Sequence, residues 1–233
     1  FGLGELFEVI PKNPVLALPD IDIKQNPDFE YRSIWGGFES EGDIWARRNR
    51  LSYPGTGKYF GHNLGNVFPP SVYGKDHPEY YAMIDGKRVV PGTDFCTEPQ
   101  PCFTNPDVIR IAAEAAEKHF REHPYAVSFS LSTNDSGVFC HCPECQKLDR
   151  GAPRSSNDAE TCSDSYYYFL SEVAKRIEPT CPGKFISGYA YWCVEQPPRY
   201  IEKLPDNVAL ELTQDSSQYF DPDYKRRDEQ TWM

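Results

Sequence analysis

The chain has 233 residues, a length that suits one large domain with a sizeable core. It carries 24 Lys and Arg against 35 Asp and Glu, which gives a net charge of -11. Because nucleic acid and anionic membranes both require a basic face, this balance argues against either as a partner. No apolar run approaches the roughly 20 residues of a transmembrane helix, so we expect no membrane insertion. No signal peptide is present, and we interpret both ends as cuts from a longer protein.

The first half of the chain shows few regular elements. Residues 1–30 are rich in Pro and short apolar runs, and they indicate an extended lead-in from a missing N-terminal domain. Strands are expected over 31–36 and 60–64. Residues 81–90 predict a hairpin, because Asp85-Gly86 supplies the positive φ angles of a tight turn.

The second half of the chain has clearer periodicity. Strict alternation of apolar and polar residues indicates strands, and apolar residues at helical spacing indicate helices. Helices and strands are expected in alternation: a helix from the N-cap Asn105 to Pro124, a strand over 126–132, a helix over 164–177, a strand over 185–192, a short helix over 198–204 and a strand over 208–213.

This alternation predicts the α/β class and a parallel sheet with right-handed crossovers. We expect an incomplete (β/α)8 barrel of the TIM type, with the catalytic domain over residues 31–233. In a barrel, one side of each strand meets the outer helices and the other side faces the lumen. The alternation turns Ser128, Ser130, Tyr189 and Glu211 inward. A purely structural barrel would prefer aliphatic residues at such positions.

Carboxylates follow the C-terminal ends of the predicted strands, the edge where barrel enzymes place their sites. We predict Asp135 and Glu211 as a catalytic pair, because glycoside hydrolysis needs an acid for the leaving oxygen and a second group at the anomeric centre. Asp135 also fits a simple turn in Asn134-Asp135-Ser136-Gly137. Glu211 is harder to explain without a function, because an inward charge is costly. Glu195 and Asp215 fit solvated loops better.

Several side chains near this pair are candidates for substrate binding. Flat aromatic rings stack on the C–H faces of sugars, and Tyr keeps a polar tip. His62 could bind sugar hydroxyls or assist proton transfer, although a loop His bonded to backbone is an equally good interpretation. Singly, each aromatic is more often part of a core. The predicted substrate-binding residues are Arg32, Trp35, His62, Asn63, Asn134, Tyr189, Tyr191 and Asp215.

The eight cysteines include the cluster Cys140-x-Cys142-x-x-Cys145, whose spacing is typical of a metal site. With Cys162 as the fourth ligand, these thiolates would form a structural zinc site. Disulfides explain the cluster equally well, and reduced buried thiols follow closely. No cofactor is expected for catalysis, because nothing near the cluster indicates an open coordination position.

Several motifs resemble the family known as domain of unknown function 4838. They span nearly the whole chain in the expected order. They are Glu5–Lys12, Trp45–Arg50, His77–Arg88, Asn105–Val108, Asn134–Gly137, the cluster Cys140–Cys145 and Leu204–Val208.

The resemblance extends to glycoside hydrolase family 163 and implies a barrel similar to those of α-glucuronidases and β-hexosaminidases. It implies a secreted, periplasmic or cell-surface glycosidase acting on a glycan, with endo-β-N-acetylglucosaminidase action on complex N-glycans as the specific expectation. The main alternative is a non-catalytic carbohydrate-binding barrel, and a weaker one is a zinc-dependent hydrolase.

Overall fold

The computed structural model describes residues 15, 20–25, 50–51, 59–93, 99–155, 159–213 and 220–226. The chain divides into two units, residues 1–57 and 58–233, and the architecture below is that of the second unit. The predicted strand over 31–36 lies outside the described residues. Arg32, Trp35 and Asp215 lie outside them as well.

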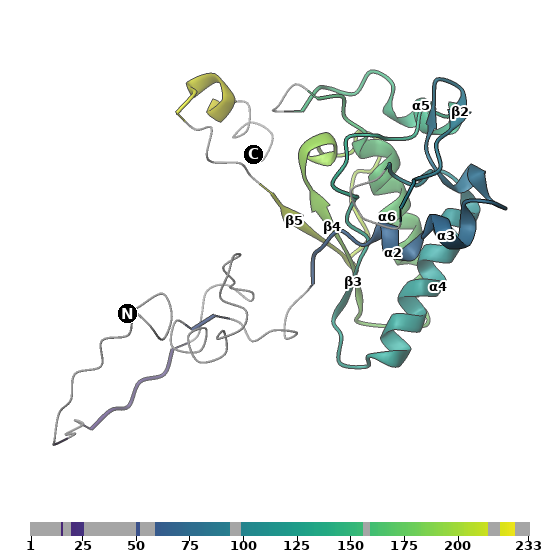
Figure 1. Ribbon diagram of the computed structural model, residues 1–233. Coiled ribbons are helices and arrows are strands. Elements are labelled where there is room, and N and C mark those ends of the chain that lie inside the picture. Colours follow the sequence, from purple (N-terminus) through teal and green to yellow (C-terminus); the bar gives the residue numbers. More distant parts are fainter. Residues whose placement is uncertain are drawn as a thin grey trace. The chain divides into compact units, whose positions relative to one another are not determined.

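A parallel sheet of three strands forms the centre of the second unit. It contains β3 (Ser128–Ser130), β4 (Phe185–Ala190) and β5 (Val208–Leu212) in that spatial order (Figure 1). The three predicted strands and their parallel direction are confirmed. The strand predicted over 60–64 is reduced to one parallel bridge, from His62 to Ser132 beside β3.

The prediction of an incomplete (β/α)8 barrel is wrong. The described residues form a small mixed α/β domain, in which a two-stranded antiparallel sheet accompanies the three-stranded parallel one. In a barrel every strand is paired on both sides, whereas β5 has only β4 as a partner in the described part of the chain. The helix predicted over 198–204 does not form. Pro197, Pro198 and Pro205 bracket six residues, too few to sustain a helix without packing.

A hollow of about 1050 Å³ lies on the helix-facing side of β5, where that crossover helix was expected. Leu210 and Tyr200 line it, and the side chain of Leu212 is exposed at its edge. Glu195, expected in a solvated loop, is instead buried against the same hollow.

Two long helices, α4 (Pro106–Glu122) and α6 (Ser163–Ile177), cover one face of the sheet and lie side by side (Figure 1). Both were predicted. The side chain of Asn105 caps α4 by accepting hydrogen bonds from the backbone N–H of Asp107 at 2.8 Å and of Val108 at 3.4 Å. Phe129 of β3 contacts His119 of α4 with ring centroids 5.1 Å apart. The helix-facing side of the strands is therefore the apolar one.

The predicted hairpin is confirmed as β1 (Met83–Ile84) and β2 (Lys87–Arg88), which pair antiparallel. Its turn residues Asp85 and Gly86 have φ angles of 48° and 76°. Shorter helices complete the unit: α2 (Leu64–Val67), α3 (Pro70–Tyr73), α5 (Pro143–Asp149) and the 3-10 turns Pro78–Tyr80 and Trp192–Val194.

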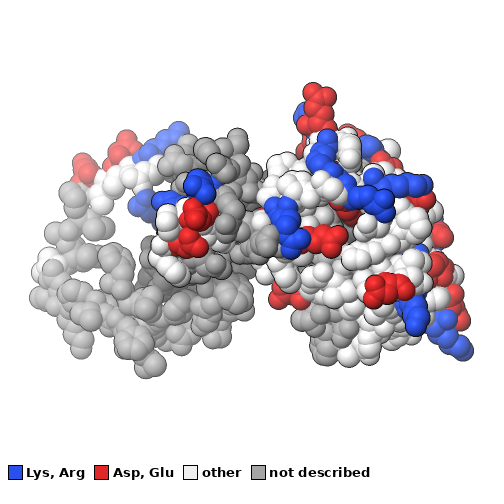
Figure 2. Space-filling view, turned by 90° about the horizontal axis from the view of Figure 1, so that it is seen from above, with Lys and Arg blue, Asp and Glu red and all other residues white. Residues whose placement is uncertain are grey.

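Among the described residues on the face shown in Figure 2, acidic and basic side chains are interspersed without a continuous basic field. Among the residues that the structure describes, no helix is long and apolar enough to cross a membrane.

Candidate functional site

The face of the sheet opposite the helices is polar, as the alternation predicted. Ser130 pairs with Ser187, and Tyr189 pairs with Glu211, so these side chains share one face. Ser130 Oγ accepts from the backbone N–H of Gly61 at 3.1 Å and donates to the carbonyl of Gly61 at 2.6 Å. The serine hydroxyls therefore hold the segment that precedes His62 against the sheet, and they are structural.

Five residues meet where β3 and β4 end, and we call them the strand-end cluster: His62, Asp135, Tyr189, Tyr191 and Trp192. The hydroxyl of Tyr191 donates to Asp135 Oδ1 across 3.5 Å. The rings of His62 and Tyr189 meet edge to face, with centroids 5.2 Å apart. The ring of Tyr191 lies 6.5 Å from that of Tyr189 and 6.4 Å from that of Trp192. The cluster thus combines an exposed carboxylate with three adjacent aromatic rings.

Trp192 takes an unusual backbone conformation at the end of β4. Its φ angle is 49°, a region that bulky residues rarely occupy. Its indole lies so close to Gly137 that an added Cβ there would be 2.8 Å from the ring. Gly137 belongs to the loop that carries Asp135, so the strained tryptophan is packed against that loop. Strain of this kind gathers at functional sites.

His62 has a defined orientation. Its Nδ1 contacts the carbonyl of Thr133. Because a carbonyl only accepts, Nδ1 carries the hydrogen, and Nε2 is the acceptor of the neutral ring. The bond ties His62 to the residue two positions before Asp135.

Glu211, on β5, lies beside Tyr189 of β4 and is exposed. Desolvation by the surrounding atoms raises the pKa of its carboxyl. Since β4 lies between β3 and β5, their backbones are about 10 Å apart. Glu211 thus lies beside Tyr189 of β4, whereas Asp135, in the loop after β3, contacts Tyr191, which directly follows β4.

Two predicted substrate-binding amides are engaged within the protein. Asn63 donates to the carbonyl of Ser130 at 2.9 Å. Asn134 is buried, accepts from the backbone N–H of Gly65 at 3.2 Å and donates to the carbonyl of Pro99 at 3.3 Å. Both amides therefore bond to the backbone near the strand ends, which is a structural role.

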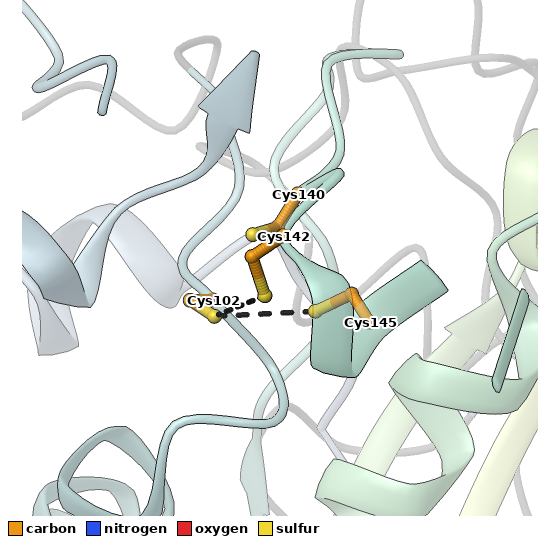
Figure 3. Close-up of side chains that lie close together, drawn as sticks. All are labelled: Cys102, Cys140, Cys142 and Cys145. Carbon is orange, nitrogen blue, oxygen red and sulfur yellow. Dashed lines mark hydrogen bonds between the residues drawn. The ribbon is translucent and has the colours of Figure 1, made fainter. Parts of the chain in front are cut away.

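A second cluster lies in the loops beside the hairpin. Cys102, Cys140, Cys142 and Cys145 are buried, and their sulfur atoms all lie within 4.8 Å of one another (Figure 3). We call them the four-cysteine cluster. Cys102 Sγ is 3.6 Å from Cys142 Sγ and 3.9 Å from Cys145 Sγ. The group can hold a metal ion.

The fourth thiol of this cluster was predicted incorrectly. Cys162 does not belong to it, because it lies at the start of α6, where its backbone N–H donates to the carbonyl of Cys193 at 2.7 Å. Cys102 takes its place. The convergence of Cys140, Cys142 and Cys145 is as expected, whereas the seven described cysteines are all free thiols rather than disulfides.

Polar groups surround the sulfur atoms. The backbone N–H of Met83 donates to Cys140 Sγ at 3.3 Å, and Thr104 Oγ1 lies 3.2 Å from Cys145 Sγ. Hydrogen bonds from Cys140 and Cys145 lower the pKa of Cys102, and the same bond to Cys102 raises the pKa of Cys140 to about 12. The environment thus favours negative charge on Cys102, and a thiolate is the form that binds metal.

Residues 3–231 match the family described as a domain of unknown function, DUF4838. The chain belongs to the DUF4838 family. No curated protein and no solved structure gives a significant match.

Two residues of this DUF4838 chain escaped sequence reasoning. Cys102 stands 38 positions before Cys140, where no local spacing links it to the cluster. Gln100 is fully buried and bonded to the loop that carries Asp135. A glutamine in a Pro-rich segment gives no pattern by which this role could be recognised.

Proposed function

We propose that this DUF4838 chain is a glycoside hydrolase that acts at the strand-end cluster. The observation that carries the proposal is the contact of Tyr191 with the exposed carboxylate of Asp135, among the rings of Tyr189 and Trp192. Aromatic faces suit the C–H faces of a sugar, and a carboxylate beside them suits the anomeric centre.

Asp135 and Glu211 are the proposed catalytic pair. Glu211 is the proposed acid for the leaving oxygen, and desolvation raises the pKa of its carboxyl. Tyr191 orients Asp135 toward the reacting carbon or its water. On an N-acetylhexosaminide, the acetamido group of the substrate can serve as the nucleophile, and complex N-glycans are the substrates to test first.

The test is release of sugar from N-glycans, followed by mass spectrometry. Asp135→Asn and Glu211→Gln should each lower kcat by about 10²–10⁴-fold. The matched control is Asp206→Asn, which removes an exposed carboxylate paired with Lys203. Glycan binding without turnover in the unmodified chain would contradict the hydrolase and support a carbohydrate-binding domain. Full activity in both site variants would place the reaction elsewhere.

We also propose that the four-cysteine cluster holds a structural zinc ion. A tetrahedral Zn–S bond of about 2.3 Å implies sulfur–sulfur edges of about 3.8 Å. The separations of 3.6 Å and 3.9 Å match these edges. Four thiolates fill a tetrahedron, so such an ion would have no open position for substrate.

Elemental analysis tests the zinc proposal. The purified chain should contain about one zinc per molecule, and Cys102→Ser should lose it. Cys162→Ala is the matched control, because it removes a buried thiol outside the cluster. A chain without zinc after purification in its presence, or loss of zinc in Cys162→Ala alone, would overturn the assignment.

A further inference from the structure

We infer that Gln100 is a positioning residue, which holds the turn around Asp135 and is itself fixed by the four-cysteine cluster. The inference rests on the proposed function, because it takes Asp135 as catalytic and the cluster as a metal centre. We call residues 134–136 the Asp135 turn. Exchange measurements can decide the inference without any substrate.

The side chain of Gln100 forms hydrogen bonds with the residues on both sides of Asp135, Asn134 and Ser136. Its Nε2 donates to the carbonyl of Asn134 at 2.8 Å and to the carbonyl of Ser136 at 2.9 Å. Its Oε1 accepts from the backbone N–H of Asn134 at 2.8 Å. Only a carboxamide supplies two donors and one acceptor in this geometry. Because Gln100 is fully buried, water cannot replace these bonds if they are lost.

The backbone of Gln100 ties the same loop to the hairpin region. Its N–H donates to the carbonyl of Val138 at 3.0 Å, and its carbonyl accepts from Ala82 N–H at 3.1 Å. Tyr81 and Pro101 form an antiparallel bridge, and Cys102 N–H donates to the carbonyl of Tyr80 at 2.8 Å. Residues 100–102 are thus an extended strip paired on one side and clamped to the Asp135 loop on the other.

The extended strip explains why the two clusters are coupled. Side chains two residues apart in an extended segment point the same way. Cys102 therefore projects toward the loop of residues 134–145, as Gln100 does. Its sulfur reaches Cys142 and Cys145 (Figure 3), while the amide of Gln100 reaches the Asp135 turn.

A bound metal changes the strength of one of these two links. Thiols are weak hydrogen-bond partners, so without an ion the Cys102 end is held by its backbone bond to Tyr80 and by weak contacts of its sulfur. Metal–thiolate bonds anchor Cys102, and with it the position of Gln100 two residues away. Tyr189 lies on β4 and Tyr191 directly follows it, so both rings lie outside this loop. Loosening the strip should disturb the carboxylate of Asp135 more than the aromatic surface.

The first experiment combines hydrogen exchange with kinetics for Gln100→Met, which keeps the length of the side chain but removes its bonds. Zinc content should stay unchanged, while exchange of the Asn134 amide speeds up about tenfold, as expected for a lost hydrogen bond. A misplaced catalytic group should lower kcat about 10–100-fold, with KM within about twofold. The control is Asn207→Ala, which removes a different amide bonded to the carbonyl of Ala174 and should move neither readout.

Gln100→Glu separates the acceptor from the donors. Its carboxyl keeps an acceptor for the backbone N–H of Asn134 but cannot donate to both carbonyls. At one fixed pH, the Asn134 amide should therefore keep more protection in Gln100→Glu than in Gln100→Met, and equal loss of protection would mean that the bond to Oε1 does not hold the turn. Because Gln100→Glu keeps the acceptor, it also provides the test if Gln100→Met does not fold.

Metal removal tests the coupling itself. Stripping zinc from the unmodified chain should speed exchange of the Asn134 amide, and stripping it from Gln100→Met should add little, because the two act through one strip. If zinc removal and Gln100→Met had additive effects on exchange of the Asn134 amide, the two would stabilise the turn independently, and the coupling would be overturned. Unchanged exchange in Gln100→Met would overturn the positioning role. If exchange changes as expected but the chain cleaves no glycan, the positioning role of Gln100 stands and the proposed hydrolase activity is rejected.

Discussion

Two regions of this DUF4838 chain are stabilised by different physics. The helix layer consists of α4, α6 and the side of the sheet that they cover. The cysteine lobe consists of residues 78–93, 99–104 and 134–149. In the helix layer, Leu170, Val173 and Ile186 are fully buried in one continuous apolar core. The lobe has a separate small cluster of Ala82 and the four cysteines, with Met83 and Ile84 at its edge. Its larger buried side chains, Tyr81, Phe103 and Phe139, pack into the core of the helix layer instead.

This contrast indicates which interactions stabilise each part of the candidate site. Each fully buried Leu, Ile or Val contributes about 1.5–3 kcal/mol, and the helix layer contains many of them. Around the thiols, away from Tyr81, Phe103 and Phe139, the lobe has few such residues, so its local geometry depends on hydrogen bonds such as those of Gln100 and on what the thiols bind. Asp135 belongs to the lobe, whereas Tyr189 and Glu211 belong to the sheet. The proposed site thus combines residues of the firmly packed sheet with Asp135, whose position depends on the hydrogen bonds of the lobe and on what its thiols bind.

The largest expected effect is the loss of metal from the lobe. Zinc binding to four thiolates contributes on the order of 10 kcal/mol in small zinc domains. Chelation should therefore speed amide exchange throughout residues 78–93 and 134–149 by about 100-fold or more, while the amides of α6 keep their protection. Mass-spectrometric exchange of the two forms measures this directly. Uniform loss of protection in both regions would mean that the comparison is wrong.

Asp149 lies at the junction of the two regions and gives a pH-dependent test. Burial raises its pKa to about 6, although its Oδ1 accepts from Ser165 N–H at 2.9 Å. The folded state therefore holds this proton more tightly than the unfolded chain, whose pKa is near 3.8. Stability contributed by the protonated form is present below about pH 4 and is lost as pH rises to about 6.

Asp149→Asn keeps the acceptor for Ser165 and removes the buried charge. At pH 7 it should raise the free energy of unfolding by up to about 3 kcal/mol, and it should flatten the dependence between pH 4 and 6. Urea titrations at several pH values measure both. A variant with the same pH dependence as the unmodified chain would assign the titration to another group.

Gly188→Ala probes the helix layer alone. A Cβ at Gly188 would lie 2.3 Å from Tyr166 Oη and 2.9 Å from Leu170 Cδ1, both fully buried. Overpacking of this kind costs about 1–3 kcal/mol of stability. Gly92→Ala is the control, because an added Cβ there meets open space. Zinc content should be the same in both variants, and zinc loss in Gly188→Ala would mean that the regions fold as one unit.

The smallest effect is expected at the cap of α4. Asn105→Ala removes the acceptor for Asp107 and Val108 and should cost about 1 kcal/mol. Asn105→Ser keeps a capping oxygen and should stay within about 0.5 kcal/mol of the unmodified chain. Thermal unfolding followed by circular dichroism distinguishes the two, and equal losses would show that the cap contributes little.

The sequence alone determined the features that depend on local periodicity. Helices α4 and α6, the hairpin at Asp85-Gly86, the three parallel strands and the division of their faces all follow from residues within one element. Capping residues, positive φ angles and alternation act over a few positions, so their physics can be read from a short window.

Only the tertiary structure decided the features that join distant segments. Cys102 rather than Cys162 completes the thiol cluster, and Gln100 holds the Asp135 turn from 34 positions away. The helix expected over 198–204 does not form in its proline-bracketed segment, and β5 has only β4 as a partner among the described residues, so the sheet does not form the expected barrel. Side-chain pairing across tens of residues depends on where the backbone places each group, and no spacing in the sequence encodes that placement.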